Sequence, residues 1–239
     1  GVMSPTKMPK MTDALEFMKL YNDVYKEDNN GNVFYTEEEM NKYLTGVDPD
    51  LYPNVNWMDE IYKDMTTSQR VNINISGGGK NVRYYVAGSI YNENGVFNAE
   101  KGDEYNPSLK WTKYNFRSNI DIDLSKSTML NLNLSTQYDV KNKPDTDDLW
   151  IYSFQTVPIA IPKEYSDGTI ARTPIGVNPY NLLNKTGYVQ QFNNNAQSLI
   201  GLTQDFSDLI TPGLKANVKF SWDAVNSTTT SRYKSPSTY

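Results

Sequence analysis

The chain has 239 residues and a formal net charge of -5, and it contains neither cysteine nor histidine. The absence of cysteine excludes disulfides and thiolate metal sites, and the absence of histidine removes the usual general base. Mild acidity argues against nucleic acid as a partner. Hydrophobic residues make up 38% of the chain, too many for disorder and too few for a helical membrane protein. No run of about 18 apolar residues occurs, so no transmembrane helix is expected.

The first 68 residues are predicted to be mainly helical. Thr12, Thr36 and Asn56 each precede an apolar pattern with helical spacing, and these residue types cap helix N-termini. Thr36 and Glu39 also have the spacing of a capping box. We therefore expect residues 1–68 to hold the end of a barrel strand followed by a helical extracellular loop.

After residue 68, apolar and polar side chains alternate with a period of two, which is typical of β-strands. In the segment 114–124, one face is Tyr, Phe, Ser, Ile, Ile and Leu, and the other is Asn, Arg, Asn, Asp and Asp. The same pattern returns at 130–140 and 214–224. A transmembrane barrel strand and a soluble sheet with one wet face both give this alternation. The predicted strands are about 69–76, 82–97, 113–124, 129–140, 189–206 and 214–230.

The lengths of the connections separate these two interpretations. The short connections are 77–81, 125–128 and 207–213, and the long ones are 4–68, 98–112 and 141–188. In an up-and-down meander, this order puts every short turn at one end and every long loop at the other. Outer-membrane barrels have that asymmetry, with tight periplasmic turns and long extracellular loops, whereas a soluble sandwich has no reason for it.

The predicted fold is therefore all-β: a segment of an antiparallel transmembrane β-barrel, in up-and-down order, with short helices in the extracellular loops. Residues 69–140 are expected to form two hairpins of barrel strands. Residues 141–188 are expected to form a long extracellular loop with a short helix, and 189–239 further barrel strands. Both ends of the chain look cut, so we expect a piece of a longer protein.

Several segments resemble SusC-type TonB-dependent transporters. Gly1–Met11 is similar to the segment that follows the plug domain of that family, and Tyr52–Tyr62 is similar to its "YPN-TDW" stretch. Val71–Phe97 resembles the family's early barrel hairpin, and Tyr114–Asp121 resembles the next strand. Together these segments cover most of the first 140 residues in the order found in the family.

The resemblance implies an integral, multi-pass protein in the outer membrane of a Gram-negative bacterium, in contact with its lipid. Such proteins have a barrel of 22 strands and an N-terminal plug. A SusD-like lipoprotein covers the extracellular mouth, and TonB pulls on the N-terminal part to open the plug. The implied function is TonB-dependent import of a large nutrient, an oligosaccharide above all, with a peptide as the other substrate class. The plug, the TonB contact and the remaining barrel lie outside these residues.

Two groups of residues are candidates for the site. Aromatic faces stack on the apolar surface of sugar rings, so aromatic residues in or beside the long loops are candidate substrate contacts. These residues are Trp57, Trp111, Trp150 and Tyr152. The alternative for the tryptophans is loop packing or a membrane-interface belt, and for Trp57 and Trp111 we prefer it. The second group is expected to face the lumen and consists of Arg117, Asn119, Asp121, Asp123, Lys215, Lys219 and Asp223.

Other classes of site and function are disfavoured. The segment 26–37 has the spacing of an EF-hand calcium loop, but Lys26 stands where the first aspartate is needed, so a polar turn and no metal are expected. No nucleophile motif is present, so neither an enzyme nor a cofactor is expected. The alternative to import is a soluble secreted or cell-surface β-domain that binds glycans, which predicts an apolar core inside and polar residues outside.

Overall fold

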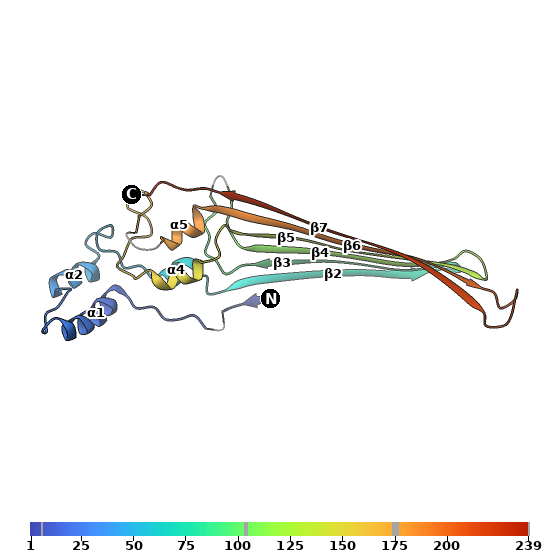
Figure 1. The fold of residues 1–239 in the computed structure, drawn as a ribbon, viewed down its shortest axis with the longest axis horizontal. Helices are drawn as coiled ribbons and strands as arrows, with labels where there is room; N and C mark the ends of the chain where they lie inside the picture. The colour runs from blue at the N-terminus through green and yellow to red at the C-terminus, as the bar shows by residue number, and fades with distance from the viewer. Residues whose placement is uncertain (6, 103–104, 174–176, 239) are drawn as a thin grey trace.

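The structure is a computed structural model that describes residues 1–5, 7–102, 105–173 and 177–238. It is elongated, with one long sheet whose strands run toward one end and all helices gathered at the other (Figure 1). Within the described residues, no helix has the length and apolar character needed to cross a membrane.

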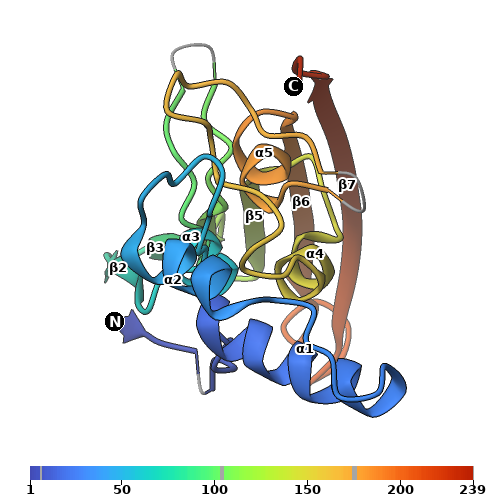
Figure 2. The same ribbon diagram turned by 90° about the vertical axis from the view of Figure 1, so that its left-hand side faces the viewer.

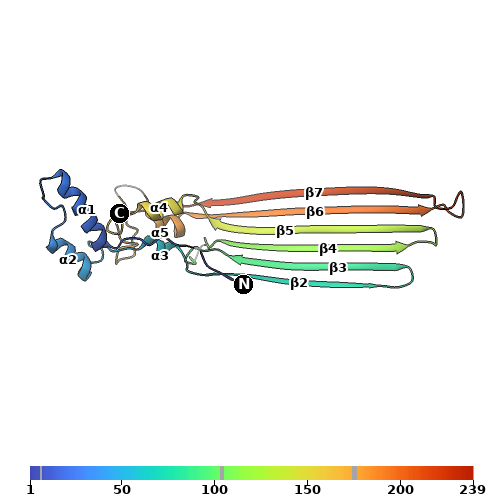
Figure 3. The same cartoon turned by 90° about the horizontal axis from the view of Figure 1, so that it is seen from below.

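The sheet has seven strands among the described residues, and their order in the sheet is their order in the chain. The strands are β1 (Val2–Met3), β2 (Thr66–Gly78), β3 (Val82–Asn94), β4 (Lys110–Asp123), β5 (Thr128–Pro144), β6 (Gly187–Asp205) and β7 (Lys215–Tyr233). Every neighbouring pair is antiparallel. The long strands β2 to β7 lie side by side (Figure 3). The predicted antiparallel meander is therefore confirmed.

Short turns join the strands at one end of the sheet, and the long connections lie at the other (Figure 1). The strand bounds differ from the predicted ones mainly at the long-loop end, where β5 continues to Pro144 and β6 begins at Gly187. These added residues lack clear alternation, but their backbones pair with the neighbouring strand, and pairing needs no alternation of side chains. β3 ends earlier than predicted, at Asn94.

Five helices occupy the long connections in the described residues: α1 (Ala14–Asp28), α2 (Glu37–Thr45), α3 (Trp57–Ile61), α4 (Leu149–Gln155) and α5 (Pro179–Asn184). The predicted caps at Thr36 and Asn56 are present. The cap of α1 is Asp13 and not Thr12, because the carboxylate of Asp13 accepts a hydrogen bond from Glu16 N at 2.8 Å. Helix α5 was not predicted, although Asn178 caps it and Pro179 occupies its first turn.

The buried core lies in the loops and not in the sheet. Side chains from α3, α4 and α5 pack together, and the residues of this loop core include Trp57, Met58, Ile61, Leu149, Tyr180 and Leu183. Viewed from the loop end, these helices lie in front of the strand ends (Figure 2). A single-layer sheet cannot bury a face against itself, so the loops supply the chain's own hydrophobic core.

Candidate functional site

The strand register sorts the side chains of the sheet onto two chemically different faces. Ile120 pairs with Leu132, Leu132 with Ile200, and Ile200 with Phe220, so these positions share one face. Apolar residues dominate this apolar face from β2 to β7, and many are exposed: Ile73 by 65%, Phe220 by 67% and Val218 by 70%. The described residues provide no second layer that covers it.

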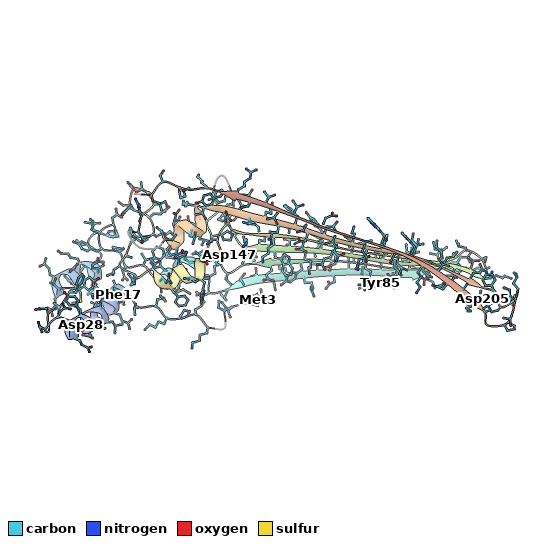
Figure 4. All side chains as sticks on the ribbon, in the orientation of Figure 1. Met3, Phe17, Asp28, Tyr85, Asp147 and Asp205 are labelled. Atoms are coloured by element: carbon cyan, nitrogen blue, oxygen red, sulfur yellow. The ribbon has the colours of Figure 1, made fainter. Side chains whose placement is uncertain are left out.

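The opposite, polar face carries amides, hydroxyls and charges. Arg117 pairs with Ser135, Ser135 with Gln197, and Gln197 with Asp223. A hollow of about 530 Å³ lies on this face, lined largely by asparagine, glutamine, serine and Tyr85. Side chains are visible along both faces of the sheet, with Tyr85 partway along it (Figure 4). The hollow extends from β2 to β6, so the polar face is concave there.

The seven residues predicted to face a lumen all lie on this polar face, by the register of β3 to β7. Several have partners there. Asn131 Nδ2 donates to Asp121 Oδ1 at 2.6 Å, and Arg83 donates two hydrogen bonds to the Asp123 carboxylate, at 2.7 and 3.0 Å. Lys215 forms an ion pair with Asp205 at 3.1 Å. The structure brings these residues onto one surface, and their contact with lumen contents remains a prediction.

Trp111 belongs to an aromatic and charged group on the polar face, near the long-loop end of the sheet. Its ring packs edge-to-face on Tyr91 with 5.7 Å between centroids, and Lys113 Nζ lies 5.0 Å from the centroid of the Trp111 ring. Arg70 lies over the Tyr91 ring at 5.4 Å, and the Tyr91 hydroxyl donates to Glu93 at 2.5 Å. Sequence reasoning missed Tyr91, Arg70 and Glu93. Alternation with an apolar neighbour was a usable signal for Tyr91 and Arg70, whereas Glu93 lies between two asparagines.

The other aromatic candidates lie in the loops. Trp57 is only 1% exposed within the loop core, so neither ring face is open to a sugar, and its position agrees with the preferred interpretation of loop packing. Trp150 is 46% exposed and packs edge-to-face on Tyr62 and Phe154. Tyr152 is half-buried in the same helix.

An ion-pair network ties three loop segments together beside the loop core. Lys163 lies 3.4 Å from Glu60 and 3.2 Å from Glu100, and the Tyr180 hydroxyl donates to Glu100 at 2.7 Å. Burial of Glu100 raises the pKa of its carboxyl, but the hydrogen bonds from Tyr180 and Lys163 and the charges of Lys163 and Lys185 outweigh this and lower it. Burial and the bond to Glu100 raise the pKa of Tyr180. The network holds the loop layer in one arrangement.

No metal centre is found in the part of the chain that the structure describes, where no group of three or more Asp, Glu, His or Cys side chains has suitable geometry. The segment with EF-hand spacing is a turn in which Asn30 and Gly31 have φ of 54° and 81°. It runs from the last turn of α1 to the start of α2.

Comparisons with known proteins agree with this architecture. No family model matches the chain. "TonB-dependent receptor P3" of Formosa agariphila is 31% identical over 81 residues, which are 34% of this chain and 7% of that protein. A structure of the RagAB peptide importer in the "closed-closed" state has a TM-score of 0.64 at 16% identity, over 97% of this chain and 28% of that chain. A second structure, of the RagAB peptide transporter, has a TM-score of 0.55 at 16% identity, over 88% and 22%.

The chain thus spans less than a third of each of these three proteins. The structural matches confirm the predicted fold, a segment of an antiparallel up-and-down β-barrel. Together with the relative, they confirm the resemblance to SusC-type TonB-dependent transporters.

Proposed function

We propose that this chain forms part of an outer-membrane barrel that imports a large nutrient with energy from TonB, together with a SusD-like surface lipoprotein. The observation that carries the proposal is the mainly apolar face that continues across six long strands, opposite a concave polar face. Exposing apolar surface to water costs about 25 cal/mol per Å². Lipid removes this cost for the apolar face, while the polar face borders a water-filled or protein-filled lumen.

The height of the apolar face supports a membrane position. Along β4 and the residue after it, the apolar face runs from Tyr114 to Leu124, ten residues further along the chain. At about 3.4 Å per residue and a tilt of about 40°, this corresponds to roughly 26 Å along the membrane normal, close to the band of about 25 Å found in outer-membrane barrels. Beyond Val140 and Phe192, toward the long-loop end, the same face carries polar residues such as Asn142, Gln190 and Thr230.

In the described part of the chain, both edges of the sheet have unpaired backbone groups, which supports a barrel that includes further strands. β1 pairs with β2 only at Thr66 and Thr67, and β7 has one strand neighbour among the described residues. An unpaired backbone amide or carbonyl in lipid costs several kcal/mol, so a membrane sheet with open edges is unstable. We propose that strands from the rest of the protein pair with both edges and close a barrel of 22 strands.

The proposed substrate is an oligosaccharide, and a peptide is the second candidate because the solved structures with this fold include a peptide importer. Amides and hydroxyls on the polar face can bond to sugar hydroxyls and to peptide groups alike. Trp111, Trp150 and Tyr152 remain the proposed contacts, and Tyr91 joins them through its packing on Trp111. No chemistry on the substrate is proposed, because the similar proteins are a receptor and importers.

The soluble glycan-binding alternative predicts apolar side chains inside and polar ones outside. The apolar face of the sheet is instead exposed, and the buried apolar cluster lies among the loops. This arrangement gives the alternative no support.

Cell fractionation of the full-length protein tests the proposal. We expect the protein in the outer membrane, with a gel mobility that shifts on heating as a folded barrel unfolds. Uptake of labelled oligosaccharides and labelled peptides would then be compared in cells with and without the protein. Recovery of the protein in the soluble fraction, without a heat-dependent shift, would refute the barrel.

A further inference from the structure

Helix α1 has a second apolar stripe that nothing in the described chain covers. Its buried apolar residues are Ala14 and Met18, and the helix contacts α2. Beside them, Phe17, Leu20, Tyr21 and Val24 recur at the i, i+3, i+4 and i+7 spacing of one helix face. Leu20 and Val24 are 54% and 66% exposed. A helix that only supports a loop has no need of this stripe.

An aromatic cluster extends the stripe across the turn between the helices. Phe34 is half exposed and packs edge-to-face on Tyr21 and Tyr25, with ring centroids 5.2 and 5.4 Å apart. Helices α1 and α2, with the turn between them, form a helical hairpin. Of its apolar residues, we call the following set the hairpin face: Phe17, Leu20, Tyr21, Val24 and Phe34. An exposed group of large apolar side chains of this kind is typical of an interaction surface.

The hairpin face is held in a fixed shape by a buried amide. Asn22 is 4% exposed, and its Nδ2 donates to the Tyr35 carbonyl at 2.7 Å. Its Oδ1 accepts from the backbone N–H groups of Phe34 and Tyr35 at 2.9 and 2.8 Å. These three bonds fix the turn against α1. A surface that is ordered before binding loses less conformational entropy when a partner docks.

Acidic residues are frequent in the segment that carries the hairpin face. The segment 13–50 contains ten aspartates and glutamates and three lysines, whereas the remaining residues have slightly more basic than acidic side chains. Two of the three lysines are already paired, Lys26 with Asp23 at 3.5 Å and Lys42 with Glu38 at 3.3 Å. The excess of negative charge therefore lies in the segment that carries the hairpin face.

The position of the hairpin restricts what can cover it. α1 and α2 form the end of the molecule farthest from the short strand turns, beyond α3 to α5 (Figures 1 and 3). Figure 4 shows Phe17 and Asp28 at this end. The hairpin is thus remote from the apolar band that we assign to lipid. A second copy of the same acidic surface is disfavoured, because like charges would face one another.

We propose that the hairpin face docks into an apolar groove rimmed by lysine and arginine on an extracellular protein partner. This inference rests on the proposed function, which supplies the partner to test, the surface lipoprotein. The spacing of the α1 side chains suits the mode in which an amphipathic helix lays its anchors into a groove. The acidic side chains of the segment 13–50 attract a basic partner and repel an acidic one.

Site-specific labelling of the full-length protein tests the proposal. Cysteine is placed at Val24 or, as a control, at Val47, which is equally exposed at 68% but lies outside the hairpin face. The chain has no cysteine of its own, and any elsewhere in the protein would be removed first. Maleimide labelling is then compared between the purified transporter alone and its purified complex with the lipoprotein.

We expect Val24→Cys to react quickly in the transporter alone and about tenfold or more slowly in the complex, while Val47→Cys reacts equally in both. Slow reaction of Val24→Cys in both samples would mean that another part of the same protein covers the face. Fast reaction in both would mean that nothing docks there. Either result would overturn the inference.

Affinity measurements separate this inference from the proposed function. Val24→Asp adds a charge to the hairpin face, so lipoprotein affinity should fall about tenfold or more, as expected for an anchor residue, whereas Val47→Asp should change it less than about twofold. Affinity of the unaltered pair should also fall with salt. If import persists and Val24→Asp binds normally, only the inference fails. If no lipoprotein co-purifies with the transporter, the surface lipoprotein is ruled out as a partner both in the proposed function and in this inference.

Discussion

Placing an arginine on either face of β6 tests the assignment of the two faces. Ile200 lies in the middle rows of the apolar face, and Leu199, the preceding residue, lies on the polar face. Both changes, Ile200→Arg and Leu199→Arg, replace an aliphatic side chain with the same cation. Only the surroundings of the new charge differ.

The expected cost differs strongly between the two positions. A lysine or arginine on the lipid face near the bilayer midplane destabilises a barrel by about 2–4 kcal/mol. At 1.4 kcal/mol per factor of ten, this is roughly 30- to 1000-fold in the folding equilibrium. Leu199→Arg places the cation on a face with amides and Asp223 nearby in register, so a surface-like cost within about 1 kcal/mol is expected.

The measurement is a guanidinium titration of the full-length protein in lipid vesicles, followed by the heat-dependent gel shift and by tryptophan fluorescence. The unaltered protein and both variants are compared under identical lipid and salt conditions. Equal costs at the two positions, or a larger cost for Leu199→Arg, would refute the assignment of the apolar face to lipid. A soluble domain would tolerate Ile200→Arg, because that side chain is 48% exposed to water in the isolated sheet.

Three further predictions concern the loops and the polar face. Asn22→Ala leaves two backbone N–H groups without their acceptor, at a local cost of about 1–3 kcal/mol, so amide hydrogen exchange should rise in the turn before α2 and not in α4. The lowered pKa of Glu100 stabilises the loop network above the ordinary carboxyl value of 4.5. This contribution is lost as pH falls below that value, so limited proteolysis of the loops should accelerate there, and less so in Glu100→Gln. Trp111→Ala should weaken substrate binding by about 0.5–1.5 kcal/mol, measured by calorimetry, whereas Trp222→Ala on the apolar face should leave it unchanged.

The sequence alone determined the strands, their order and the placement of short and long connections. Alternation and capping depend on residues a few positions apart, so a local pattern is enough to indicate them. The residues of the polar face followed from the same alternation, since a strand fixes which side chains share a side. The resemblance to transporters likewise rested on short contiguous segments.

Only the tertiary structure decided which aromatic side chains are exposed and therefore accessible to a substrate. Trp57 and Trp150 both lie in the first turn of a short helix, yet Trp57 is buried and Trp150 is half exposed. The difference arises because α3 packs against α4 and α5, which are about a hundred residues away in the chain. Likewise, Trp111 meets Tyr91 through the register of two strands separated by a long loop. Such contacts depend on how segments that are distant in the sequence pack together. A pattern of neighbouring residues carries no information about this packing.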